Sequence, residues 1–217
     1  MCIRNRVISL IYKAIVVAVS LTGLLTLFGF PGMFMLGAMK YFTTLSNVLC
    51  LLFFAAAFIH TFIQLFTLGA HGTSTLLPRL KGSITIAITV TLLIYQLLLS
   101  ETPFSMNGRS GDFIVHFLTP VLVILDWLLF DEKGRCTFLD PLVWTIIPLL
   151  YVAFALLAAP LGLTYYSGGR YPYFFMDIDA IGGRSVFAYI AAITVSFLVL
   201  SYLVVLLDRL LSRHRRE

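Results

Sequence analysis

Residues 41–67 read YFTTLSNVLCLLFFAAAFIHTFIQLFT, a long apolar segment that begins with aromatic and hydroxyl side chains. A helix needs about 20 apolar residues to cross a hydrocarbon layer of about 30 Å, and it satisfies its own backbone hydrogen bonds in lipid. This segment is therefore long enough to cross a membrane once. Five further stretches meet the same criterion, and the six predicted spans are 11–32, 41–67, 83–100, 113–130, 142–163 and 186–207.

The composition of the whole chain also favours a protein embedded in a membrane. Of its 217 residues, 60% are hydrophobic and 12% are charged, whereas soluble domains are about half apolar and about a quarter charged. A water-soluble fold of this size could not keep so much apolar surface away from water. The sequence predicts one all-α domain over residues 1–217, an integral membrane bundle of six transmembrane helices with no room for a further soluble domain.

The distribution of Lys and Arg predicts which side of the membrane holds the termini. An even number of spans places both termini on one side, and most Lys and Arg residues fall there, so we expect both termini in the cytoplasm. The residues on this side are Arg4, Arg6, Lys13, Arg79, Lys81, Lys133, Arg135, Arg209, Arg213, Arg215 and Arg216, whereas the other side holds Lys40, Arg109, Arg170 and Arg184. Lys13, within the first span, is expected to reach toward the interface.

Two polar residues stand at matching depths on two spans that are predicted to run in the same direction. Thr43 lies near the start of the second span and His116 near the start of the fourth. At about 1.5 Å per residue, their depths agree within roughly one helical turn. A hydroxyl and an imidazole at one depth can meet across a bundle, and a hydroxyl nucleophile needs such a base. The alternatives are a helix cap or back-bonded hydroxyl for Thr43 and a structural role for His116.

Further polar residues lie near this pair in the sequence. Ser46 and Asn47 fall one turn below Thr43 on the same helix face. Asn47 could donate to a substrate carbonyl, orient His116, or form an interhelical hydrogen bond. Asp112 lies one turn before His116, where it could orient the imidazole or cap the helix. The unpaired N–H groups at the two helix N-termini could hold an oxyanion and would disfavour a protonated imidazole.

The longest external loop, residues 164–185, is aromatic rather than merely polar. It contains the run Tyr171-Pro172-Tyr173-Phe174 and four glycines. Because Tyr side chains suit a membrane interface, one interpretation is an aromatic belt. The other is a lid or wall that is hinged by its glycines and folds over an external cavity. In that case Tyr171 and Tyr173 would contact or support the substrate.

Three further carboxylates were considered for this site. Asp126 lies within the fourth span, where a carboxylate is costly and often functional. It lies about 15 Å deeper than His116 by helical rise. We therefore expect Asp126 to pair with a basic loop residue and not to join Thr43. Asp177 and Asp179, in the aromatic loop, are further candidates for a group that orients the imidazole.

The sequence favours neither metal binding nor nucleic-acid binding. The cysteines Cys2, Cys50 and Cys136 do not form the pattern of a disulfide framework, and no close pair of Cys or His ligands predicts a zinc site. The basic cluster at residues 213–216 is too short, and too close to a span, to favour nucleic acid. An attraction to anionic lipid fits the positive charge better.

Three stretches together resemble a known family. They are Lys40-Tyr41-Phe42-Thr43, His116 followed by Pro120 and Asp126-Trp127, and Tyr171-Pro172-Tyr173-Phe174. With six spans, they resemble the androgen-induced and androgen-dependent-regulating (FAR-17a-like) membrane proteins, and especially their bacterial six-span relatives, the Pr6Pr family. Animal members are hydrolases of fatty acid esters of hydroxy fatty acids that use an intramembrane Thr nucleophile and a His. The animal pattern carries a fuller His-rich run before the fourth helix, and its spacing from His to Pro is one residue longer.

The resemblance implies that Thr43 is a nucleophile, that His116 is its base, and that the protein lies in a bacterial inner membrane. We therefore expect a membrane hydrolase of lipid esters that needs no cofactor and takes its acyl ester from the outer leaflet. Two other classes of function remain open. One is a non-catalytic lipid-binding protein or small transporter, and the other is an intramembrane protease or acyltransferase that uses the same Thr and His.

Overall fold

The computed structural model describes residues 2–29, 36–100, 110–165 and 168–213. Within these residues the chain forms helices and no β-strand. Six helical stretches there are long and apolar enough to cross a membrane, which confirms the predicted all-α bundle. The six spans are Arg6–Leu27, Phe42–Leu68, Pro78–Leu99, Gly111–Phe130, Asp140–Ala158 and Gly183–Ser212. Arg109, Arg215 and Arg216, which entered the predicted charge distribution, lie outside the described residues.

Some spans are single helices and others are built from successive segments. The first, second and sixth spans correspond to α1 (Arg6–Leu27), α2 (Phe42–Leu68) and α9 (Gly183–Arg213). The third consists of α3 (Pro78–Ile94) and the π-helix η2 (Tyr95–Leu99). The fourth consists of α4 (Ser110–Phe113), the π-helix η3 (Ile114–Leu118) and α5 (Thr119–Phe130), and the fifth of α6 (Asp140–Trp144) and α7 (Ile146–Ala158). Short helices in the loops are η1 (Leu36–Lys40), η4 (Phe174–Met176) and α8 (Ile178–Ile181).

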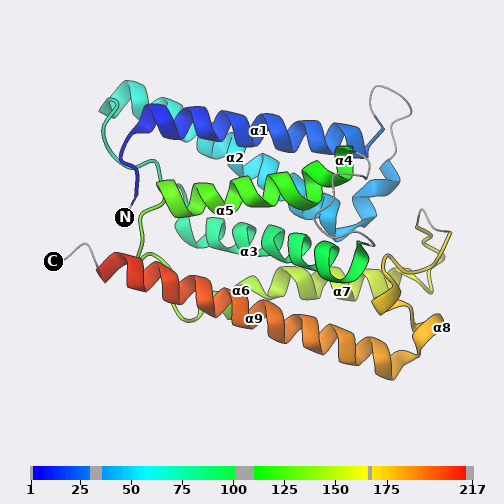
Figure 1. Ribbon diagram of the computed structural model, residues 1–217. Coiled ribbons are helices and arrows are strands. Elements are labelled where there is room, and N and C mark those ends of the chain that lie inside the picture. The colour runs from blue at the N-terminus through cyan, green and yellow to red at the C-terminus, as the bar shows by residue number, and fades with distance from the viewer. Residues whose placement is uncertain (1, 30–35, 101–109, 166–167, 214–217) are drawn as a thin grey trace.

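The start of α1 and the end of α9 lie at the same end of the bundle, as Figure 1 shows. We call this the terminal end and the opposite one the distal end. Helix α3 has a central position, because it packs against α2 and α5 and also against α6 and α9. The distal end holds the N-terminus of α2, the segments η2 and η3, and the aromatic loop with η4 and α8.

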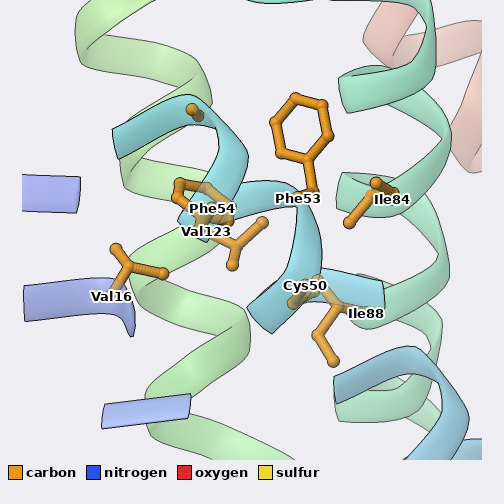
Figure 2. Packing of buried hydrophobic residues seen from close by; sticks show 8 residues of the cluster. Val16, Cys50, Phe53, Phe54, Ile84, Ile88 and Val123 are labelled. Atoms are coloured by element: carbon orange, nitrogen blue, oxygen red, sulfur yellow. The ribbon is translucent and has the colours of Figure 1, made fainter. Parts of the chain in front are cut away.

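A layer of apolar side chains fills the middle of the bundle (Figure 2). It joins α1, α2, α3 and α5 through Val16, Cys50, Phe53, Phe54, Ala57, Ile84, Ile88 and Val123. On each of these helices, polar residues lie on the distal side of this layer. Charged or polar residues lie on its terminal side. The bundle therefore contains two separate polar clusters with packed hydrocarbon between them.

The fifth and sixth spans were predicted to end at residues 163 and 207, whereas they end at Ala158 and Ser212. Two predicted span starts were also wrong. The first span begins at Arg6 rather than at residue 11, because the Asn5 side chain accepts hydrogen bonds from Val7 N (2.9 Å) and Ile8 N (3.1 Å) and caps the helix. The third span begins at Pro78 rather than at residue 83, with Pro in the first turn, where its missing N–H is tolerated. Lys81, which was assigned to a cytoplasmic loop, therefore lies inside α3.

The terminal end of the bundle holds a buried cluster of two lysines and two aspartates, which we call the terminal ion cluster. Lys81 donates to Asp126 and, at 2.8 Å, to Asp131 Oδ1. Lys13 Nζ lies 3.7 Å from Asp126 Oδ1. All four residues are 2% exposed or less. The prediction that Lys13 reaches the interface was therefore wrong, and Asp126 pairs with lysines on α1 and α3 rather than with a loop residue.

Candidate active site

The structure brings Thr43 and His116 together at the distal end. Thr43 lies in the first turn of α2, and His116 lies in η3. Thr43 Oγ1 is 3.2 Å from His116 Nε2, and both residues are buried, at 9% and 8% exposure. The matched depth that the sequence indicated thus corresponds to a side-chain contact between two helices that are far apart in the chain.

The second nitrogen of His116 determines what Nε2 can do. His116 Nδ1 lies 3.0 Å from the main-chain oxygen of Asp112. A carbonyl oxygen can only accept, so Nδ1 carries the proton and Nε2 presents a lone pair to the Thr43 hydroxyl. Asp112 thus orients the imidazole through its backbone and not through its carboxylate. Its place in the first turn of α4, after Ser110, also differs from the predicted helix cap.

Tyr95 stacks on His116, a contact that the sequence did not indicate. The two rings have centroids 3.8 Å apart and planes 15° apart. Each ring belongs to a π-helical turn, η2 for Tyr95 and η3 for His116, and π turns in helices are often found at functional sites. A Tyr near the end of a span is common in membrane proteins, so the sequence carried no specific signal for this contact.

Asn47 and Ser46 hold the backbone around the pair. Asn47 Nδ2 donates to the main-chain oxygens of Thr43 (2.9 Å) and Val115 (3.1 Å), and so joins α2 to η3 beside His116. Ser46 Oγ donates to Thr43 O at 3.0 Å and lies 2.9 Å from Thr91 Oγ1 on α3. Because both N–H groups of the Asn47 amide are engaged, Asn47 forms the interhelical bond that was one of its three predicted roles.

Close packing of α1 against η3 fixes the other side of His116. A Cβ atom on Gly23 would lie 2.6 Å from Ile114 Cγ2 and 2.9 Å from Val115 Cγ1. Such distances are shorter than van der Waals contact, so a larger residue here would push η3 away. Gly23 therefore permits the close approach that sets the position of the His116 backbone.

A cavity of about 70 Å³ lies next to the pair. Its wall is almost entirely apolar and is built from α2, α3 with η2, α7, η4 and α9. Thr43, Tyr95 and Tyr173 are on this wall, whereas His116 is not. Thr43 thus lines the cavity, and its hydroxyl also contacts the imidazole of His116.

The aromatic loop covers this cavity and brings Tyr173 next to Thr43. The phenol of Tyr173 interacts with the Thr43 side chain and with Tyr151, and burial raises the pKa of Tyr173. Its ring contacts those of Tyr41 (6.2 Å between centroids) and Phe175 (5.2 Å). The predicted loop therefore forms part of the cavity wall through Tyr173, Phe175 and Met176.

Other residues of the loop have structural positions. Tyr171 packs against the apolar cluster beneath the loop but does not line the cavity. Asp177 accepts from Ala180 N at 3.0 Å and caps α8, and Asp179 binds Arg170 at 3.1 Å. Neither carboxylate orients His116. The loop is anchored to the start of α2, because Lys40 Nζ donates to Thr164 O at 2.9 Å.

Comparison with known proteins found no matching family model, no matching curated protein and no matching solved structure. The family resemblance of the three sequence stretches therefore stays a prediction. What the site can do has to be inferred from its own geometry.

Proposed function

We propose that this multi-pass membrane protein is an intramembrane threonine hydrolase of lipid esters, of the type in which a fatty acid is esterified to a hydroxy fatty acid. The observation that carries the proposal is the 3.2 Å contact between Thr43 Oγ1 and His116 Nε2. It is supported by the Asp112 carbonyl, which leaves Nε2 free to accept a proton. The apolar cavity beside Thr43 suits an acyl chain.

The reaction uses the pair in two stages. The Thr43 hydroxyl gives its proton to His116 Nε2 while Oγ1 attacks the ester carbonyl, and the tetrahedral intermediate carries the negative charge on the former carbonyl oxygen. Its collapse breaks the bond to the leaving alcohol, which takes the proton from His116, and leaves an acyl ester on Thr43. Water, deprotonated by His116, then attacks this ester and releases the fatty acid and the free Thr43 hydroxyl.

Groups at the start of α2 and on the loop are suited to stabilise the negative charge. The N-cap residue Tyr41 makes no side-chain hydrogen bond to the helix, and the main-chain N–H groups of Phe42 and Thr43 interact with the Tyr173 phenol instead. The hydroxyl of Tyr173 is close to the Thr43 side chain. Asn47 was a further candidate, but its N–H groups are bound to main-chain carbonyls. Hydrogen-bond donors of this kind are typically worth about 10²–10³ in turnover.

The predicted orientation gives the route of the substrate. With the termini in the cytoplasm, as the Lys and Arg distribution predicts, the distal end faces the outer leaflet of a bacterial inner membrane. A lipid ester would then reach Thr43 from that leaflet. The same apolar cavity would also accommodate a lipid that is bound and not cleaved, so a non-catalytic lipid-binding protein or small transporter is the second candidate.

The test is labelling of the purified protein by a fluorophosphonate probe, together with release of fatty acid from a hydroxy-fatty-acid ester. We expect both in the wild type, neither in Thr43→Ala, and a fall of at least about 100-fold in His116→Ala. Thr44→Ala is the matched control, because it removes the neighbouring buried hydroxyl, which has no hydrogen-bond partner in the described structure. Equal labelling of Thr43→Ala, or an inert wild type, would favour the lipid-binding alternative.

A further inference from the structure

The proposed reaction also requires a group that stabilises the protonated form of His116. When His116 takes the Thr43 proton it becomes a cation inside a buried site, and a buried charge is costly unless a neighbour stabilises it. Asp112 contributes its carbonyl to Nδ1, not its carboxylate. Hydrolases that use a hydroxyl and a histidine usually supply a carboxylate at this position.

The Asp112 carbonyl occupies the Nδ1 position, and the aromatic face of Tyr95 lies against the face of the imidazole. Its ring lies 3.8 Å from the imidazole and nearly parallel to it. A protonated imidazole above an aromatic face is attracted to the negative face of the ring, most strongly where water is excluded. The neutral imidazole gains less from the same contact, so the stacking favours the state that forms during the reaction.

Tyr95 also completes the restraint on the orientation of the imidazole. The Asp112 carbonyl and the Thr43 hydroxyl bind the two ring nitrogens. These two contacts lie at the edge of the ring and close to its plane. The parallel ring of Tyr95 adds a contact on one face of the imidazole. Because Tyr95 lines the cavity and His116 does not, the phenol ring also separates the imidazole from the acyl chain.

We infer that Tyr95 is the positioning residue for His116, holding the imidazole plane and stabilising its protonated form where no carboxylate is bonded to Nδ1. This inference rests on the proposed function. The polar or charged groups that face His116 are Thr43 from α2, Tyr95 from η2, and Asp112 from α4. The aromatic face carries the effect, so the Tyr95 hydroxyl is dispensable.

The experiment separates the rate of probe attachment from the affinity for the probe, in the full-length protein in detergent. We expect Tyr95→Leu to slow fluorophosphonate attachment at saturating probe by about 30-fold, as a desolvated cation–π contact implies, with little change in the half-saturating concentration. Tyr95→Phe should keep a rate within about threefold of the wild type. Leu99→Ala, at another cavity-lining position of η2, is the matched control and should change the half-saturating concentration more than the rate.

The outcomes of this experiment distinguish failure of the proposed function from failure of the proposed role of Tyr95. A wild type that is not labelled would overturn the proposed function and this inference together. A labelled wild type with Tyr95→Leu attaching probe at the same saturated rate would overturn the role of Tyr95 alone. Tyr95→Phe as slow as Tyr95→Leu would also overturn it, because the hydroxyl would then carry the effect. Thermal unfolding of each variant excludes loss of folding as the cause.

Discussion

The two buried polar clusters of this bundle lie at opposite ends of the third and fourth spans, and they differ in the charge of their side chains. The terminal ion cluster joins two lysines to two aspartates, which neutralise one another. The distal site joins an uncharged hydroxyl to an imidazole with a free lone pair. The cavity borders Thr43, and none of the four charged residues lines it.

The difference follows from what each set of groups requires inside a membrane. Charges buried there are stable only when they are paired and hydrogen-bonded. Each charge in the terminal ion cluster accordingly lies next to an opposite charge. A neutral Thr–His pair can be buried at lower cost and can leave one lone pair for chemistry. We therefore propose a structural role for the terminal ion cluster and a reactive role for the distal site, although an ionisable residue in a span would by itself suggest the reverse.

The largest expected effect comes from breaking the charged cluster. Asp126→Ala leaves Lys13 without its carboxylate and Lys81 with Asp131 alone, so an uncompensated charge is buried. Removing one partner of a buried ion pair typically lowers the free energy of unfolding by about 3–5 kcal/mol. We expect a large fall in thermal stability and in the yield of folded protein, measured in detergent.

A matched change at the distal site should affect folding much less. Thr43→Ala removes an uncharged group, and losing one such hydrogen bond typically lowers the free energy of unfolding by about 1 kcal/mol. A change of all four residues of the cluster, Lys13, Lys81, Asp126 and Asp131, to apolar residues of similar size should restore part of the stability that Asp126→Ala loses. If Asp126→Ala is no less stable than Thr43→Ala, the structural role of the terminal ion cluster is wrong.

A smaller effect on stability is expected from Gly23→Ala, which tests the contact between α1 and η3 at the distal site. The added methyl would meet Ile114 and Val115 at 2.6 and 2.9 Å and push η3 away from α1. Overpacking of this kind typically lowers the free energy of unfolding by about 1–3 kcal/mol. A displacement of about 1 Å can reduce turnover by about 100-fold. We therefore expect a large fall in the rate of probe labelling while the variant remains folded.

The control for this change is another glycine of the chain. Gly183 lies at the start of α9, with no atom within 4 Å of the position a Cβ would take. Gly183→Ala should therefore leave both labelling and thermal stability close to the wild type. Labelling of Gly23→Ala at the wild-type rate would show that the α1–η3 contact does not position His116.

Much of this architecture could be predicted because it depends on length and helical rise. Six apolar stretches define the spans, and about 1.5 Å per residue places Thr43 and His116 at one depth. The buried position of Lys81 could not be predicted in the same way, because a basic residue just after Pro78 is typical of a loop. Its helical position depends on Asp126 and Asp131, which neutralise it only in the folded bundle.

The finer parts of the site depend on contacts that have no sequence pattern. The π turns that carry Tyr95 and His116 arise from the local packing of the helices, and a single Tyr near a span end does not reveal its stacking partner. Asp112 was a candidate because of its carboxylate, yet its main-chain oxygen makes the bond. Any residue at that position could supply a main-chain carbonyl, so the identity of the side chain does not predict this hydrogen bond.

The most direct test of the central claim is to find where the acyl group is attached during the reaction. The wild-type protein would be mixed with a hydroxy-fatty-acid ester, quenched in acid within milliseconds, digested and analysed by mass spectrometry. The mechanism predicts a peptide that carries the acyl mass on Thr43, and more of it at early times than at steady state. An acyl group on Ser46, Thr44 or Thr91 instead, or turnover of the ester with no acylated peptide at any time, would contradict it.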